Sequence, residues 1–183
     1  YRILQRGCHA SLVHFHGAPF LTKASAEKAS DLAEVLTKYQ YQTKLYSVPF
    51  GEIQRQVMLC APLPLRVILY RRLMIRIAEV LGQQNQAQAL VTGESLAQVA
   101  SQTLTNIGVI QEAATLPILR PLIGMDKNEI SAKAEQIKTY EIAIQPDQDC
   151  CSLFVPKHPA THSKLEEIKA AELMLNINTL ISQ

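Results

Sequence analysis

Short apolar runs alternate along this chain with longer segments in which apolar residues recur at helical spacing. Ala26, Ala29, Leu32 and Leu36 show this spacing in one such segment. The short runs predict strands at residues 10–16, 43–48, 86–91 and 116–119. The longer segments predict helices at residues 25–39, 52–60, 65–83, 96–104, 127–138 and 163–181, and the end of another helix at residues 1–7.

This alternation predicts an α/β fold, in which a parallel sheet is flanked by helices on both faces. In such folds ligands bind just outside the carboxyl ends of the strands. The residues to inspect for function therefore come at or just after the end of each strand. They are His14-Phe15-His16, Pro49-Phe50, Thr92-Gly93-Glu94-Ser95 and Arg120-Pro121.

Length and composition are those of an ordinary globular domain. The chain has 183 residues, of which 48% are hydrophobic and 19% charged, and its net charge is +2. A charge this small does not indicate a nucleic-acid surface, so any RNA contact must come from local patches or from another part of the protein. No apolar run is long enough to cross a bilayer, and the four cysteines do not form a secreted disulfide pattern. We therefore predict a cytoplasmic protein with no membrane contact.

The adjacent cysteines Cys150 and Cys151 are the most distinctive chemical feature. They follow an acidic, proline-containing approach at residues 145–149, which predicts a surface loop. An exposed thiol pair is a reactive group, because sulfur nucleophilicity depends on access and on the thiolate fraction. The alternatives are a half-buried cysteine with an idle neighbour, or a strained vicinal disulfide.

The segment Thr92-Gly93-Glu94-Ser95 lies where a predicted strand leads into a predicted helix. Gly93 would let a ligand approach the backbone without a Cβ in the way, and Gln98 and Gln102 would share one helical face. The alternative is local structure, with Ser95 as the N-cap and Gly93 as a turn former.

Arginines and histidines also allow two interpretations. Arg71, Arg72 and Arg76 lie in an apolar helix, where they either extend past the core to water or direct guanidinium groups at phosphate. His14 and His16 share one strand face, either as core residues or as rings packed against a purine base. They lack a spaced cysteine or carboxylate partner, so we predict no metal site.

Five segments form a more specific pattern than any single motif. They are Val-His-Phe-His at 13–16, Arg-Arg-Leu-Met-Ile-Arg-Ile-Ala at 71–78, Leu-Val-Thr-Gly-Glu-Ser-Leu-Ala-Gln-Val-Ala-Ser-Gln-Thr-Leu at 90–104, Arg-Pro-Leu-Ile-Gly-Met-Asp-Lys at 120–127, and Asp-Cys-Cys-Ser-Leu-Phe-Val-Pro-Lys-His-Pro-Ala-Thr at 149–161. In order and spacing, over almost the whole chain, these segments resemble the ThiI family, the tRNA 4-thiouridine synthetases.

The resemblance implies a Rossmann-like adenylation domain of the ATP-pyrophosphatase (PP-loop) type. Such a domain would use ATP and magnesium to activate a tRNA uridine, at position eight, and would replace its O4 with sulfur to give 4-thiouridine. A cysteine desulfurase would supply the sulfur as a cysteine persulfide. The same sulfur could also serve thiamine thiazole synthesis.

The resemblance also implies roles for particular residues. His14, Phe15, Arg71, Gly93 and Gln102 match ATP contacts of the family. Cys151 best matches the sulfur-handling cysteine, because the Asp-x-Cys pattern fits Asp149-Cys150-Cys151. Cys150 is the close alternative.

The chain departs from the family pattern in what it lacks. It contains no Ser-Gly-Gly-x-Asp-Ser pyrophosphate loop, no ferredoxin-like or THUMP region for tRNA and no rhodanese-like domain. We therefore expect an N-terminally truncated chain, with a partial PP-loop domain at residues 1–162 and a helical tail at 163–183. Alone it would be inactive, because it lacks the pyrophosphate loop. tRNA would bind through the missing N-terminal domains. A homodimer through an unpaired strand edge is an open alternative.

Two other functions compete with this one. The chain could belong to a different PP-loop adenylating ligase, or it could be a non-catalytic nucleotide-binding module. A Ser-Gly-Gly-x-Asp-Ser loop in the complete protein would favour an enzyme.

Overall fold

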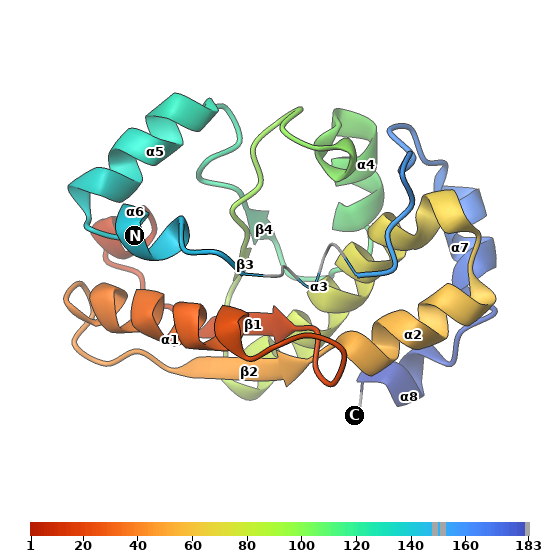
Figure 1. Cartoon of the computed structure of the whole chain (residues 1–183), viewed down its shortest axis with the longest axis horizontal. Helices are drawn as coiled ribbons and strands as arrows, with labels where there is room; N and C mark the ends of the chain where they lie inside the picture. Colours follow the sequence, from red (N-terminus) through yellow and green to blue (C-terminus); the bar gives the residue numbers. More distant parts are fainter. Residues whose placement is uncertain (148–149, 151–152, 182–183) are drawn as a thin grey trace. The chain divides into compact units, whose positions relative to one another are not determined.

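The computed structural model describes residues 1–147, 150 and 153–181 (Figure 1). The chain divides into two compact units. Unit 1 contains Tyr1–Glu52 and Met125–Ser152, and unit 2 contains Ile53–Gly124 and Leu153–Gln183. Each unit is thus assembled from two segments that are far apart in the sequence.

Unit 1 is built on a β-α-β arrangement. Its elements are the strand β1 (Leu12–His16), the helix α1 (Ala24–Thr37) and the strand β2 (Leu45–Pro49). The two strands are parallel and pair in register from their first residues to their last. The helix α1 packs against both strands, as Figure 1 shows. Both strands therefore end at the same edge, where ligands bind in α/β folds.

The shorter helices of unit 1 include the 3-10 helix η1 (Leu4–Arg6), α5 (Lys127–Gln136) and α6 (Tyr140–Ala143). Gly7 ends η1 in the left-handed conformation, with φ of 81°, as the sequence predicts. Asp126 caps α5 by accepting the N–H groups of Asn128 and Glu129, and the Glu129 carboxylate accepts the N–H of Asp126 in return. This capping box confirms the predicted cap at Asp126.

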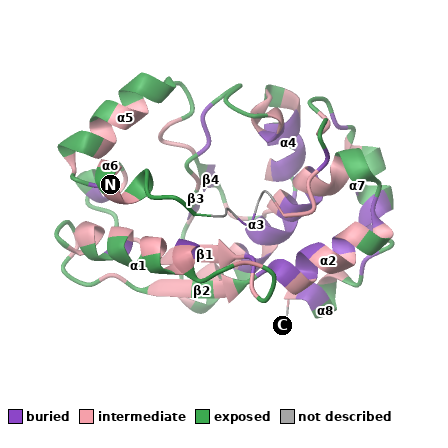
Figure 2. Ribbon diagram, viewed as in Figure 1, coloured by how far each residue is buried: buried purple, intermediate pink, exposed green. Residues whose placement is uncertain are grey.

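Unit 2 is mainly helical and surrounds the long helix α3 (Arg66–Gln84). Its other elements are α2 (Gly51–Cys60), which begins in unit 1, η2 (Leu63–Leu65), β3 (Leu90–Val91), η3 (Ala100–Gln102), α4 (Leu104–Gln111), β4 (Ile118–Leu119), α7 (Leu165–Glu172) and α8 (Ile177–Ile181). The helix α3 packs against α4, α7 and α8, and Figure 2 shows that buried residues concentrate along it. The short strands β3 and β4 pair in parallel.

A buried carboxylate anchors the approach to β4. Glu79 of α3 accepts hydrogen bonds from the backbone N–H groups of Thr115 and Leu116, both at 2.7 Å, and from the Thr115 hydroxyl at 2.9 Å. Burial by itself would raise the pKa of Glu79, but these hydrogen bonds outweigh it and lower the pKa. Glu79 is therefore ionised, and its hydrogen bonds attach α3 to the segment that leads to β4.

The predicted α/β class, with parallel strands flanked by helices, is confirmed. The predicted strand positions are also occupied, but β3 and β4 are only two residues long each. Within the described residues the strands form two separate parallel pairs, β1 with β2 and β3 with β4.

The predicted helix at residues 96–104 is wrong. Leu96 donates its N–H to the carbonyl of Ile123, in the turn after β4, and Ala97 has a positive φ of 61°. The positive φ of Ala97 is incompatible with a helix that starts at Leu96. The helix starts instead at Leu104, because the hydroxyl of Thr103 accepts the N–H of Asn106 as an N-cap.

The predicted helix at residues 163–181 is interrupted, since α7 ends at Glu172 and α8 begins at Ile177. Leu173 and Met174 between them are exposed, so the apolar pattern there does not mark a buried helical face. Both helices pack within unit 2.

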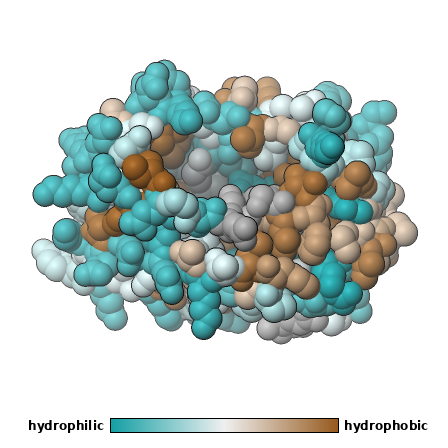
Figure 3. Space-filling model, in the orientation of Figure 1, coloured by the Kyte–Doolittle hydropathy of each residue, from teal (hydrophilic) through white to brown (hydrophobic). Residues whose placement is uncertain are grey.

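Hydrophobic and hydrophilic residues are mixed on the face shown in Figure 3. Hydrophobic residues gather over α2 and the segment after it, where Leu59 and Leu63 are exposed. Among the described residues, no helix combines the length and the apolar character that a membrane crossing requires.

Candidate functional site

Charged side chains meet at the carboxyl ends of β3 and β4. Glu94, which follows β3, is only 1% exposed. Its carboxylate accepts hydrogen bonds from Nη2 of Arg71 at 2.9 Å, from Nε of Arg120 at 2.6 Å and from the hydroxyl of Thr92 at 2.9 Å. Arg71 belongs to α3, and Arg120 directly follows β4. We call Arg71, Glu94, Arg120 and their neighbour Gln111 the Glu94 cluster.

The Glu94 cluster carries an excess of positive charge. Burial alone would raise the pKa of Glu94, but hydrogen bonds from Arg71 and Arg120 outweigh it and hold the pKa below its usual value. Glu94 is therefore ionised and balances only one of the two guanidinium groups. Arg120 is also held from a second side, because its Nη1 donates to the side-chain oxygen of Gln111 at 2.7 Å.

Gly93 lies beside this cluster in an open position. Its backbone is not in the left-handed region, and an added Cβ would have no heavy atom within 4 Å. Neither the backbone nor the packing therefore requires glycine, so the interpretation of Gly93 as a turn former has no support. Ser95 is not a helix N-cap either, because Thr103 caps α4.

Gln102 lies in η3, within the loop that connects β3 to α4. Its side-chain oxygen is buried and has no hydrogen-bond partner in the part of the chain that the structure describes. The backbone carbonyl of Gln102 accepts the N–H of Ala97 at 2.9 Å. Gln98 and Gln102 do not share a helical face, because the segment between them is not an α-helix.

The strand ends of unit 1 hold a second group of predicted residues. The rings of His14 and His16 stack with centroids 6.3 Å apart, which confirms that they share one face of β1. Phe15 packs edge-on against Phe50 at 5.4 Å, and Phe50 is fully buried. Phe15 therefore contributes to packing, and a nucleotide contact through His14 and Phe15 stays a prediction.

Backbone segments approach closely at this edge of unit 1. An added Cβ at Gly51 would lie 2.6 Å from the carbonyl oxygens of Gly17 and Ala18. The N–H of Phe50 donates to the carbonyl of His16 at 2.8 Å. The chain after β1 and the start of α2 therefore pack backbone against backbone, which only glycine permits at position 51.

Lys28 of α1 holds the chain that leads to the cysteine pair. Its ammonium group donates to the carbonyl of Gln145 at 2.6 Å and of Ala143 at 3.1 Å, and it pairs with the carboxylate of Asp147 at 3.1 Å. This contact could not be predicted from the sequence, because Lys28 has the pattern of an ordinary charged residue on an amphipathic helix.

Cys150 is buried, with 5% of its surface exposed. The expectation of a thiol pair exposed on a loop is therefore wrong for Cys150. A cysteine side chain is small and weakly polar, so it can be buried even after an acidic, exposed approach. Cys151, the preferred sulfur-handling residue, lies outside the described residues.

Arg72 has a structural role that neither of its two interpretations foresaw. It is fully buried, and it donates from Nε and Nη2 to the Glu172 carboxylate at 2.8 and 2.9 Å and from Nη2 to Glu112 at 2.9 Å. Its Nη1 bonds the carbonyl of Val109. Arg76 reaches Glu172 as well, at 3.1 Å. Arg72 therefore faces neither water nor a ligand.

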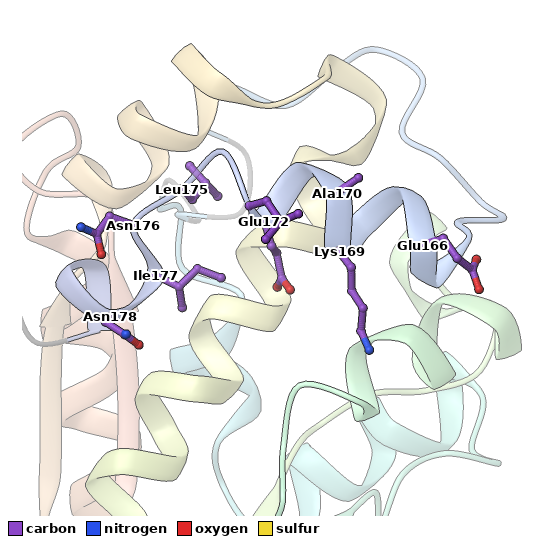
Figure 4. A pocket seen from close by; sticks show the side chains of 9 residues that line it. Glu166, Lys169, Ala170, Glu172, Leu175, Asn176, Ile177 and Asn178 are labelled. Atoms are coloured by element: carbon purple, nitrogen blue, oxygen red, sulfur yellow. The ribbon is translucent and has the colours of Figure 1, made fainter.

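Two further features do not coincide with the predicted site. Within the described ranges, no three His, Cys, Asp or Glu side chains are grouped to hold a metal ion. A groove of about 970 Å³ lies along α7 and α8, with Lys169, Glu172, Asn176 and Ile177 among its lining residues (Figure 4). Glu172 is already bound by Arg72, and the groove contains none of the predicted site residues.

Comparison with known proteins identifies the family. The family described as thiamine biosynthesis protein (ThiI) matches residues 1–177. The chain belongs to the ThiI family. Its similar proteins include the probable tRNA sulfurtransferase of Thermus thermophilus, 50% identical over 182 residues, which cover 100% of this chain and 45% of that protein. The probable tRNA sulfurtransferase of Nocardia farcinica is 45% identical over 183 residues, again 100% of this chain and 45% of the relative.

A solved structure also resembles this ThiI-family chain. It is described as the crystal structure of a 4-thiouridine synthetase–RNA complex with bound ATP, and it matches with a TM-score of 0.87 and 39% sequence identity. The match covers 93% of this chain and 45% of that one. The chain thus spans about half the length of the curated relatives and of the solved structure that it matches.

The residues that the ThiI resemblance predicts fall into two groups. Arg71, Gly93 and Gln102 lie in unit 2, in or beside the loop after β3, whereas His14, Phe15 and Cys150 lie in unit 1. The sequence placed Glu94 and Arg120 among the strand-end residues to inspect, but it did not assign a specific role to either of them. The available signal was their position, because both directly follow predicted strands.

Proposed function

We propose that this chain is the adenylation and sulfur-transfer part of a tRNA sulfurtransferase that converts the uridine at position eight of tRNA to 4-thiouridine. The observation that carries the proposal is the match, at 39% identity and a TM-score of 0.87, to a 4-thiouridine synthetase in complex with RNA and ATP. The name of the Thermus relative, at 50% identity over the full length of this chain, supports the same reaction.

In the first proposed step, the uridine O4 bonds to the α-phosphorus of ATP and pyrophosphate leaves. The bound AMP is then a good leaving group at C4. Magnesium belongs to this step, because Mg²⁺ in such sites binds largely through substrate phosphates and one or two carboxylates.

In the second proposed step, the terminal sulfur of a persulfide on Cys151 attacks C4 and displaces AMP. A second thiol then attacks the Cys151 sulfur, which leaves sulfur on C4 and closes a disulfide. An external thiol must reduce that disulfide before the next turnover. A cysteine desulfurase would load the persulfide, and Cys150 is the alternative carrier. The family description, thiamine biosynthesis protein, suggests that the same persulfide also serves thiazole synthesis.

His14, Phe15, Arg71, Gly93 and Gln102 are the proposed ATP contacts. Three observations in unit 2 support the assignment of Arg71, Gly93 and Gln102. The Glu94 cluster has excess positive charge, Gly93 leaves open space, and the Gln102 side-chain oxygen lacks a hydrogen-bond partner among the described residues. A tRNA substrate would place the protein in the cytoplasm. The proposal leaves a homodimer as an alternative, to be tested by measuring the oligomeric state in solution.

The test uses the protein expressed from its complete open reading frame. Purified protein is incubated with unmodified tRNA, ATP, magnesium, cysteine and a cysteine desulfurase, and 4-thiouridine is measured by nucleoside mass spectrometry. We expect Cys151→Ser to abolish the product and Cys150→Ser to reduce it. Cys60→Ser, which changes the half-buried cysteine at the end of α2, is the control and should leave the product unchanged.

Each other outcome assigns a different function. Near-normal thiolation by the Cys151→Ser protein would remove that cysteine from the mechanism. AMP formation without thiolation would favour another adenylating ligase. ATP binding without turnover would favour a nucleotide-binding module.

A further inference from the structure

Arg120 has one buried donor that the protein does not use. Its Nε bonds Glu94 at 2.6 Å, and its Nη1 bonds Gln111 at 2.7 Å. Its Nη2 is buried and finds no hydrogen-bond partner anywhere in residues 1–147, 150 and 153–181. A buried donor without an acceptor is costly, and in native proteins such a group often marks a ligand, ion or water site. The Arg120 side chain is 12% exposed, so it is largely removed from water but a ligand can still reach it.

Arg71 completes the site from the opposite side of Glu94. Its Nη2 donates a hydrogen bond to Glu94 at 2.9 Å, and its side chain remains 26% exposed. One carboxylate therefore orients two guanidinium groups, while its single charge neutralises only one of them. A planar guanidinium presents paired N–H donors whose spacing fits the oxygens of a phosphate. The hydrogen bonds between the two groups are stronger when the guanidinium is removed from water.

The position of the pair in the fold fits a ligand. Arg120 directly follows β4, and Glu94 lies just after β3. The two strands are parallel, so both residues lie at the carboxyl edge, where α/β folds bind ligands. Gly93 next to Glu94 leaves open space on the same loop. Thr92 fixes Glu94 further, since its hydroxyl donates to the carboxylate at 2.9 Å.

We propose that Arg120, together with Arg71, forms an oxyanion site that binds a phosphate group of the nucleotide, and that Glu94 is the positioning residue that holds both arginines in place. This inference rests on the proposed function for the identity of the ligand. The nucleotide is favoured over an RNA backbone, because the chain as a whole has a net charge of only +2 and the unused donor is one buried NH2 group of a single guanidinium.

The test compares Arg120→Gln, Arg120→Lys and wild type in the protein from its complete open reading frame. Calorimetry measures binding of ATP, inorganic pyrophosphate and adenosine. We expect Arg120→Gln to weaken ATP and pyrophosphate about tenfold to a hundredfold, the range expected for one hydrogen bond to a charged group. Adenosine should bind as in wild type. Arg120→Lys should fall between, because it keeps the charge and loses the fork.

Arg76→Gln is the control, since Arg76 lies on α3 as Arg71 does but bonds Glu172 and not Glu94. It should bind all three ligands normally. Glu94→Gln tests positioning: the cluster gains positive charge, so a purely electrostatic site would bind pyrophosphate more tightly, whereas a site that needs oriented arginines would bind it more weakly. The thermal shift that pyrophosphate induces is measured in every variant, so that a lower baseline stability does not hide the result.

The outcomes separate this inference from the proposed function. Wild-type affinity for ATP in the Arg120→Gln protein overturns the phosphate site. Loss of tRNA affinity with normal ATP affinity also overturns it, because the phosphate would then belong to RNA. If wild type binds pyrophosphate through Arg120 but forms no 4-thiouridine, the site stands and the proposed function fails.

Discussion

Two glycines occupy equivalent places in the sequence and have different physical roles. Gly51 and Gly93 each lie two residues beyond the end of a parallel strand. At Gly51 an added Cβ would lie 2.6 Å from two backbone carbonyl oxygens, whereas at Gly93 it would meet nothing within 4 Å. Gly51 is therefore required by packing in the protein itself. If Gly93 is required, the requirement must come from a bound molecule.

Substitution by valine should separate these two requirements. Gly51→Val should destabilise the protein by at least about 1–3 kcal/mol, because backbone atoms must move to admit the side chain. Gly93→Val should leave the thermal midpoint unchanged and weaken ATP binding about tenfold. Thermal unfolding and calorimetry on the protein from its complete open reading frame would measure both. Wild-type ATP affinity in the Gly93→Val protein would contradict a nucleotide pocket at this loop.

Individual site residues could be predicted from the sequence only where their position in a recognisable segment indicated a chemical role. Gly93 and Arg71 were found because they lie in segments that resemble the ThiI family. Glu94 was missed, since a carboxylate beside a predicted nucleotide site has no evident role until Arg71 and Arg120 are seen on its two oxygens. Burial of Cys150 was weighed only as an alternative to an exposed thiol pair, because the residues that precede it, 145–149, are acidic and include a proline.

At the scale of elements, a buried ionic network joins three helices of unit 2. Arg72 of α3 is fully buried and bonds Glu172 at the end of α7 and Glu112 at the C-cap of α4. Lys169 of α7 also pairs with Glu112, at 2.6 Å. The Arg72–Glu172 contact joins residues 100 positions apart in the sequence, so the network fixes how α7 packs on α3.

Removing Glu172 should therefore be severe. Glu172→Ala leaves the buried Arg72 charge with only the half-exposed Glu112, and we expect a loss of about 3–5 kcal/mol in the free energy of unfolding. The double change Arg72→Met with Glu172→Leu should lose much less, because no charge stays buried. The control Glu167→Ala removes an exposed pair with Lys164 at 3.9 Å and should change stability by less than about 1 kcal/mol. Urea titration of all variants would measure these differences, and equal losses in the two Glu variants would contradict the network.

The same network shows why some elements were predictable and others were not. The helices α1 and α3 were predicted closely, because each has a long apolar repeat that its packing uses. Residues 96–103 also contain apolar side chains, yet Leu96 and Val99 are exposed and the backbone bonds the turn after β4 instead. That hydrogen bond is a tertiary contact, so periodicity alone could not reveal it.

At the scale of the whole molecule, the predicted site residues are divided between two compact units. His14, Phe15 and Cys150 lie in unit 1, and Arg71, Gly93 and Gln102 lie in unit 2. The α/β class could be predicted from the alternation of strands and helices, and the family could be predicted from the order of the motifs. The two units could not be predicted, because each is assembled from separate segments of the chain.

The 183-residue chain by itself should bind nucleotide weakly and release no measurable pyrophosphate. It contains no Ser-Gly-Gly-x-Asp-Ser loop, whose backbone amides would hold the phosphates that carry most of the charge of ATP. It keeps the Glu94 cluster and the residues matched to the adenosine side, so some affinity for ATP or AMP should remain. Its net charge of +2 predicts no tRNA binding at physiological salt, because such binding depends on neutralising phosphates.

Incubation of this isolated chain with ATP, magnesium and tRNA tests that expectation directly, with the protein from the complete open reading frame as the positive control. Pyrophosphate release and AMP are followed over time, and tRNA binding is measured across a salt series. We expect product only from the longer protein. The isolated chain should show at most a thermal shift with ATP, and Arg120→Gln should remove that shift. Robust AMP formation by the isolated chain would mean that catalysis needs only groups within these residues, and the adenylation mechanism proposed here would have to be abandoned.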